Sequence, residues 1–402
     1  GSMVAGFIAT RWGRRSALLL AALLFVLSSL GSALPELGFG GIGAMGPAAL
    51  PMFIAYRILG GTGIGLASLV SPMYIAEIAP RAVRGRLVSY NQMAIVTGIV
   101  GVYFVNWAIA AQGDDAWLHA VGWRWMFASA MVPAAAFFAL LLSAPDSPRW
   151  LVLRGRDAEA DALLHRLEGD AEAVQAMAEI RASLVVPTQP LLSYGIGVIV
   201  IGILLSVFQQ AVGINAVLYY APSIFQNMGL GGNAALLQTV LVGSVNFAAT
   251  LIAIFTVDRW GRKPLLIGGG LIMGAAMAWL ALCFQLSALG SGALLAMLLY
   301  IAGFALSWGP VCWVLLAEIY PNSIKGKALS IAVAAQWLAN VIVSWSFKVI
   351  DGDSALIAAF HHGFAYWMYA GFSLLSALFV WRLVPETKGR TLESIEALWK
   401  RP

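Results

Sequence analysis

Charged residues are scarce in this chain. Only 11% of its 402 residues are Asp, Glu, Lys or Arg, 60% are hydrophobic, and the mean hydropathy is +0.84. Soluble globular domains carry about 25% charged residues. No charge occurs between Arg181 and Asp258, or between Lys263 and Glu318. Because about 20 apolar residues suffice to cross the hydrocarbon core, this composition excludes a soluble domain and indicates an integral membrane protein.

Three further absences narrow the fold and the function. The apolar stretches lack the alternating polarity of transmembrane β-strands, so we expect an all-α fold, because helices satisfy their own backbone in lipid. The two cysteines, Cys283 and Cys312, lie in apolar stretches and predict no disulfide framework. No nucleophile, metal cluster or phosphate loop occurs at a plausible site, so we expect no enzyme activity, no cofactor and no metal.

Long apolar segments predict about ten full transmembrane helices and a short stub. The Gly-rich segment 60–65 falls inside one of them, which favours close helix packing over a nucleotide-binding loop. The stub covers residues 3–10, and the full spans are expected near 16–34, 47–76, 88–111, 123–144, 191–228, 233–257, 264–287, 292–317, 328–349 and 360–384.

A set of charged motifs occurs twice. The first copies start at Arg11, Glu77, Arg84 and Pro145, and the second copies follow about 240 to 248 residues later, at Arg259, Glu318, Lys325 and Pro385. The duplication predicts two six-helix bundles. About 67 apolar residues precede the second copy of the motif Arg-Trp-Gly-Arg, at Arg259, but only about ten residues precede the first copy, at Arg11. We therefore expect that the first bundle lacks its first transmembrane helix and most of its second.

The repeats also set the expected domains. Residues 1–144 form the N-terminal bundle, 145–190 a cytoplasmic helical linker, 191–384 the C-terminal bundle, and 385–402 a cytoplasmic tail. Apart from Arg57, Arg124 and Lys348, the 24 Lys and Arg residues occur in alternate connections. This positive-inside pattern puts the C-terminus in the cytoplasm and argues against nucleic acid as a partner.

Neutral polar and aromatic residues lie within the spans. Amides can both donate to and accept from sugar hydroxyls, and an indole can cover the C–H face of a pyranose. The alternative is that each amide only holds helices together. Helix breaks are expected at Gly213 to Asn215 and at Trp308 to Pro310. The residues are Gln92, Gln209, Gln210, Asn215, Asn246, Gln336 and Asn340, with Tyr219, Trp308, Trp313 and Trp337.

Charged residues suggest two further roles. Arg57 lies inside a span and has no carboxylate at the same depth, so it is a candidate for proton coupling, or else binds backbone carbonyls or water. The repeated cytoplasmic charges are candidates for a gate of ion pairs, such as Glu77 with Arg84 and Glu318 with Lys325, or are topology determinants alone. The gate candidates are Arg11, Arg14, Arg15, Glu77, Arg84, Asp258, Arg262, Glu318 and Lys325.

These motifs make the chain similar to the sugar porter family of the major facilitator superfamily. The resemblance rests on five segments: Arg11–Arg15, Pro145–Arg149, Gln209–Asn215, Trp308–Trp313 and Pro385–Gly389. It implies sugar contacts at Gln92, Gln209, Gln210, Asn215, Tyr219, Asn246, Gly309, Trp313, Gln336 and Trp337, with Phe304 nearby.

The resemblance also implies a function. It implies transport of D-xylose or a related pentose or hexose by alternating access, in the bacterial inner membrane, with membrane lipid as a partner. In the complete protein, coupling to protons would use a carboxylate in the first span that pairs with Arg57. Ile99 stands where a second glutamine is expected, as in the facilitative glucose carriers. A facilitative uniporter and a transport-dead sugar-binding sensor therefore remain alternatives.

Overall fold

The computed structural model describes residues 1–37, 49–80, 84–185, 189–229, 232–321, 323–388 and 399. For helical residues 84–86, 88–89, 171, 183–185, 232–234, 258 and 317 it describes only the backbone. These described ranges are built from helices and turns and contain no strand. Within these described ranges, ten helical segments are long and apolar enough to cross a membrane, which confirms the predicted number of spans.

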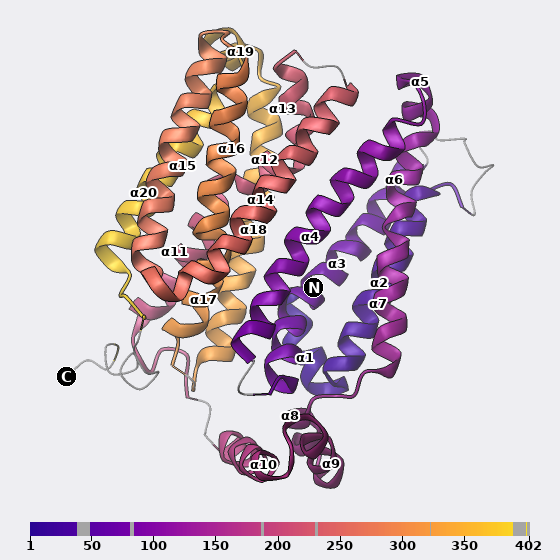
Figure 1. Ribbon diagram of the computed structural model, residues 1–402, viewed down its shortest axis with the longest axis vertical. Helices are drawn as coiled ribbons and strands as arrows, with labels where there is room; N and C mark the ends of the chain where they lie inside the picture. The colour runs from indigo at the N-terminus through magenta and orange to yellow at the C-terminus, as the bar shows by residue number, and fades with distance from the viewer. Residues whose placement is uncertain are drawn as a thin grey trace. The chain divides into compact units, whose positions relative to one another are not determined.

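The chain divides into two compact units, residues 1–94 with 105–187 and residues 95–104 with 188–402. In chain order (Figure 1), the first unit contains α1 (Ser2–Trp12), α2 (Arg14–Ala33), α3 (Leu50–Ile78), most of α4 (Arg84–Ala110), α5 (Asp115–Trp117), the π-helix η2 (Leu118–Gly122), α6 (Trp123–Ser129), α7 (Met131–Ser143), α8 (Pro148–Leu153), α9 (Asp157–Glu168) and α10 (Asp170–Val185).

The second unit contains the remaining helices. They are α11 (Ile196–Ala211), α12 (Ile214–Tyr219), α13 (Ala221–Asn227), α14 (Gly232–Trp260), α15 (Arg262–Gln285), α16 (Ser291–Leu306), α17 (Trp308–Ile319), α18 (Lys325–Asp351), α19 (Ser354–Phe360) and α20 (Phe364–Leu383).

Glycine allows α2 and α3 to approach closely in the first unit. A Cβ at Gly60 would lie 2.3 Å from Ser28 Oγ, and one at Gly63 would lie 2.9 Å from the Phe25 ring. This contact is the close packing expected for the Gly-rich segment, because small residues let transmembrane helices pack backbone to backbone. A side chain at either glycine would force the side chain of Ser28 or Phe25 to shift.

Amphipathic helices follow the first bundle. In α9, Asp157 and Glu159 occupy the first turn, and His165 and Arg166 occupy the last, an order that complements the helix dipole. Residues Leu151, Leu163, Leu164 and Met177 form a small apolar core of their own among α8, α9 and α10.

Two spans of the second unit are interrupted. Gly213, between α11 and α12, has φ 92° and ψ 10°, a left-handed conformation that is readily available only to glycine. Ser307, between α16 and α17, has φ −134° and ψ −87°. The first break lies where it was predicted. The second was predicted at Trp308 to Pro310 but occurs at Ser307, so Trp308 to Pro310 form the first turn of α17, where proline is tolerated.

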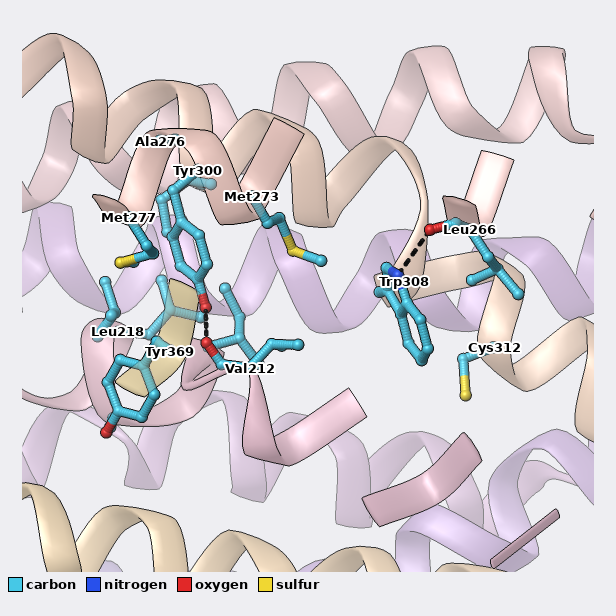
Figure 2. Close-up of a cluster of buried hydrophobic side chains, with 14 of the residues drawn as sticks. Val212, Leu218, Leu266, Met273, Ala276, Met277, Tyr300, Trp308, Cys312 and Tyr369 are labelled. Carbon is cyan, nitrogen blue, oxygen red and sulfur yellow. Dashed lines mark hydrogen bonds between the residues drawn. The ribbon is translucent and has the colours of Figure 1, made fainter. Parts of the chain in front are cut away.

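The core of the second unit surrounds these breaks. Trp308 and Tyr300 are fully buried there and are, with Tyr320, its largest side chains with no exposed surface. In Figure 2 each donates one hydrogen bond to a backbone carbonyl: Trp308 Nε1 to Leu266 at 2.9 Å, and Tyr300 OH to Val212 at 2.8 Å. The sequence analysis expected the Trp308 ring to offer a face to a sugar. That expectation was wrong, because the ring is packed in the core.

Candidate functional site

The break at Gly213 brings polar side chains together at the end of α11 and the start of α12. Gln209 and Gln210 occupy the last turn of α11, and Asn215 lies in the first turn of α12. Gln209 and Gln210 expose only 3% and 5% of their surface. A buried amide needs hydrogen-bond partners, and the geometry of the break determines which partners lie within reach.

Four amides form one network, which we call the amide cluster: Gln209, Gln210, Asn215 and Gln336. Asn215 Nδ2 donates to Gln210 Oε1 at 2.7 Å, and Gln210 Nε2 donates to Gln209 Oε1 at 3.2 Å. Gln336 Nε2, from α18, also donates to Gln209 Oε1. Gln209 is therefore the residue on which the network converges.

The second break fixes the orientation of Gln209. Its Nε2 donates to the carbonyl of Trp308 at 3.2 Å and to that of Gly309 at 3.5 Å. These carbonyls belong to the first turn of α17, directly after the break at Ser307. Because Nε2 is held there, Oε1 points toward Gln210 and Gln336. Both breaks thus contribute to one polar site in an apolar bundle.

The cluster retains unused hydrogen-bonding capacity in α18. Gln336 Oε1 and Trp337 Nε1 are buried and make no hydrogen bond within the described part of the chain. One is an acceptor and the other a donor. Leaving such groups unpaired costs free energy. A ligand with hydroxyl groups could satisfy both, since a hydroxyl donates and accepts.

The other predicted sugar contacts of the second unit make no hydrogen bond to the cluster among the described residues. Asn246 in α14 is buried, Trp313 and Phe304 are half-buried, and Tyr219 is 57% exposed. Asn340 is buried and accepts a hydrogen bond from Ser344 at 3.2 Å. In the first unit, Gln92 is half-buried on α4.

Arg57 projects from α3 and is exposed. Its guanidinium lies 5.2 Å from the centroid of the Phe127 ring, a cation–π arrangement. No carboxylate forms an ion pair with it among the described residues. Its place in a span matches the sequence analysis, and its proposed role in proton coupling stays a prediction.

Both units repeat one arrangement of charges. Arg14 binds Glu77 through two hydrogen bonds of 2.8 and 2.9 Å, and Arg262 binds Glu318 through two of 3.2 and 2.9 Å. These partners differ from the predicted ones. Glu318 pairs with Arg262 and not with Lys325 in the described chain. The side chains of Arg84 and Asp258 lie outside the described residues.

A second carboxylate completes each copy by capping a helix. Asp146 accepts hydrogen bonds from the backbone N–H groups of Arg14 and Arg15, at the start of α2. Glu386 accepts from those of Arg262 and Lys263, at the start of α15. Carboxylates at these positions satisfy orphan donors and complement the helix dipole. The sequence analysis found the repeated Pro-Asp and Pro-Glu pairs but assigned them no role.

Electrostatics at this cap favour the ionised form of Glu386. Burial alone would raise the pKa of its carboxyl, but four backbone N–H groups donate to it, and they hold its pKa below the ordinary value.

The remaining gate candidates lie elsewhere. Arg15 donates to the carbonyls of Leu141 and Leu142, Arg11 is exposed, and Lys325 is half-buried.

The sequence analysis missed a buried ion pair in the first unit. Arg124, from α6, binds Glu36 through both of its terminal nitrogens and also donates to the carbonyl of Ala33 at 3.0 Å. Glu36 is only 3% exposed. The hydrogen bonds from Arg124 hold the pKa of the Glu36 carboxyl below its ordinary value despite burial. The sequence carried no signal for it, because the two residues are 88 positions apart.

Comparisons with known proteins show which family the chain belongs to. The family model described as "Sugar (and other) transporter" matches residues 1–399. The D-xylose-proton symporter of Escherichia coli K12 is 53% identical over 409 residues, covering 100% of this chain and 83% of the relative. The glucose facilitated diffusion protein of Zymomonas mobilis is 49% identical over 404 residues, covering 100% and 85%.

Solved structures of a xylose symporter also match this chain. The proton:xylose symporter XylE bound to 6-bromo-6-deoxy-D-glucose matches with a TM-score of 0.86 at 53% identity, covering 100% of this chain and 86% of that structure. The inward open conformation of XylE from E. coli matches with a TM-score of 0.88 at 51% identity, with the same coverage.

Proposed function

Because this chain belongs to the sugar transporter family of the major facilitator superfamily, we propose that it carries a neutral monosaccharide across the bacterial inner membrane by alternating access. The observation that carries this proposal is the amide cluster. Four neutral amides are held together inside an apolar bundle, and among the described residues one buried acceptor of the cluster, Gln336 Oε1, and the buried donor Trp337 Nε1 of the next residue have no hydrogen-bond partner.

The chemistry of the cluster favours a neutral polyol. No charged side chain takes part in its described hydrogen bonds, so neither an anion nor a cation would find a counter-charge there. Amides can grip two neighbouring hydroxyls by donating to one and accepting from the other. The identity of 53% to a D-xylose-proton symporter supports D-xylose, or a related pentose or hexose, as the substrate.

Coupling to protons is part of this proposal where a carboxylate pairs with Arg57, the candidate residue, because the guanidinium stays charged at physiological pH and cannot itself exchange the proton. The alternative is facilitated diffusion, which is favoured by Ile99 in place of a second glutamine and by the 49% identity to a glucose facilitator. A third candidate, a sensor that binds sugar without moving it, shares the same site and differs only in its lack of flux.

Flux measurements in proteoliposomes separate these candidates. Vesicles that contain the purified chain and unlabelled D-xylose should exchange it for external labelled D-xylose, whereas a sensor would bind the sugar without this counterflow. An inward proton gradient should then drive accumulation above the external concentration if transport is proton-coupled, and only equilibration if it is facilitated. Absence of both binding and counterflow, for D-xylose and for other pentoses and hexoses, would refute the proposed function.

A further inference from the structure

The backbone carbonyl of Val212 needs a hydrogen-bond donor from outside α11. Val212 follows the last residue of α11, where carbonyls lack a donor from the helix itself. Val212 is fully buried, so water cannot donate a hydrogen bond to its carbonyl. A buried unpaired carbonyl destabilises the fold. The Tyr300 hydroxyl, from α16, donates to it at 2.8 Å (Figure 2).

Packing holds Tyr300 in place. The ring has no exposed surface and belongs to the same core as Met273, Ala276 and Met277, which flank it in Figure 2. Well-packed cores leave a ring of this size little room to move. A second tyrosine confines the turn as well, since a Cβ at Gly213 would lie 2.5 Å from Cδ2 of the Tyr369 ring. Two tyrosines therefore hold the Val212–Gly213 turn.

This turn determines how the amide cluster is assembled. Gln210 lies on its α11 side and Asn215 on its α12 side, and their side chains are joined by the 2.7 Å hydrogen bond across the break. A small rotation at Val212 or Gly213 would separate the two amides. We propose that Tyr300 is a positioning residue for the sugar site, which holds the turn in its binding-competent geometry without touching the sugar. This inference rests on the proposed function.

The size of the effect follows from the hydrogen bond. If the bond is lost, the competent turn becomes less populated, and the apparent affinity falls by the same factor. A hydrogen bond between neutral groups corresponds to roughly 2- to 13-fold in such an equilibrium. Because affinity follows the competent fraction, we therefore expect Tyr300→Phe to weaken D-xylose binding by at most about this factor.

Tyr320→Phe is a matched control. Tyr320 is also fully buried in the second unit, but its hydroxyl has no hydrogen-bond partner among the described residues. Isothermal titration of the full chain in detergent, with D-xylose, should show weaker binding for Tyr300→Phe and unchanged binding for Tyr320→Phe. Unchanged affinity in Tyr300→Phe, or equal losses in both variants, would overturn the inference.

A double-mutant cycle separates positioning from general packing. If Tyr300 acts through the cluster, Tyr300→Phe should cost little further affinity in an Asn215→Ala background, because the bond across the break is already gone. Equal losses in the two backgrounds would mean that the hydroxyl acts elsewhere, and would overturn the inference. Normal sugar binding by the unsubstituted chain in the same experiments shows that such a failure does not affect the proposed function.

Hydrogen exchange tests the inference even if Tyr300→Phe does not fold. In the sugar-free, unsubstituted chain, the amides of Gly213 and Val217, which donate to the carbonyls of Gln210 and Gly213 at 2.9 and 3.0 Å, should exchange as slowly as those in the middle of α11, since the turn is pinned without ligand. Fast exchange confined to these residues would show that the turn is not held, and would overturn the inference.

Discussion

Replacing Gln209 with alanine should weaken sugar binding more than any other single amide truncation in the amide cluster. Gln209 accepts from Gln210 and Gln336 and donates to the carbonyls of Trp308 and Gly309, so four hydrogen bonds disappear, of which three are shorter than the 3.5 Å contact with Gly309. Asn215→Ala removes only one, to Gln210. At about 0.5–1.5 kcal/mol per bond, the three amount to about 1.5–4.5 kcal/mol. Part of this is lost as stability, so we expect an affinity loss of about 10- to 100-fold for Gln209→Ala and about 2- to 13-fold for Asn215→Ala.

Isothermal titration with D-xylose, on detergent-purified protein whose folding is checked by thermal unfolding, measures both losses. Gln285→Ala is the control, since Gln285 is an exposed amide at the end of α15 that accepts a hydrogen bond from Trp367. It should bind sugar like the unsubstituted chain. If Gln209→Ala cost no more than Asn215→Ala, Gln209 would not be the residue that organises the cluster.

Three other substitutions or conditions give separate tests. Trp313→Ala should lower sugar affinity about 2- to 13-fold, because the ring contact with the sugar is lost. Trp381 is 55% exposed at the end of α20, so Trp381→Ala should leave the affinity unchanged. Equal losses in the two variants would indicate an effect on packing. Glu386→Gln should lower thermal stability at neutral pH by about 0.3–1 kcal/mol. The folded pKa of Glu386 is depressed, so its contribution to stability is fully present above its ordinary pKa of about 4.3 and is lost as the pH falls through the folded pKa. A stability difference between Glu386→Gln and the unsubstituted chain that persisted below the folded pKa would contradict this. Arg57 faces the Phe127 ring and no carboxylate among the described residues, so titration calorimetry should find sugar affinity nearly constant between about pH 5.5 and 8; a tenfold change would identify a titrating group elsewhere.

The spans could be predicted because their signal is local. Twenty apolar residues between charged loops indicate a transmembrane helix without any knowledge of neighbours, and the ten predicted spans are confirmed. Helix ends were less accurate. The span predicted to start at 16 begins at Arg14. The sequence near Arg14 could not show this start, because the side chain that caps it, Asp146, lies 132 residues further along the chain.

The site could be predicted only in part, because its contacts also join residues that are far apart in the sequence. Residue type showed that Gln209 and Gln336 are costly to bury and therefore need partners. It did not show that they would bond to each other across 127 residues. Tyr300 carried no signal at all, since a tyrosine in an apolar span resembles ordinary core. Its role depends on a carbonyl that becomes available only when α11 ends at Gly213.

The two carboxylate caps also have a consequence for biosynthesis. Each one joins the start of a long helix to a residue 132 or 124 positions later, so the cap forms only after that residue has been made. Asp146 and Glu386 are about 240 residues apart, and at about 5–20 residues per second roughly 12 to 50 seconds separate their synthesis. The first unit can therefore close its cap while the ribosome is still making the second. A stalled or truncated product that ended before Glu386 would carry one closed bundle and one open bundle, with the N-terminus of α15 uncapped in the membrane interface.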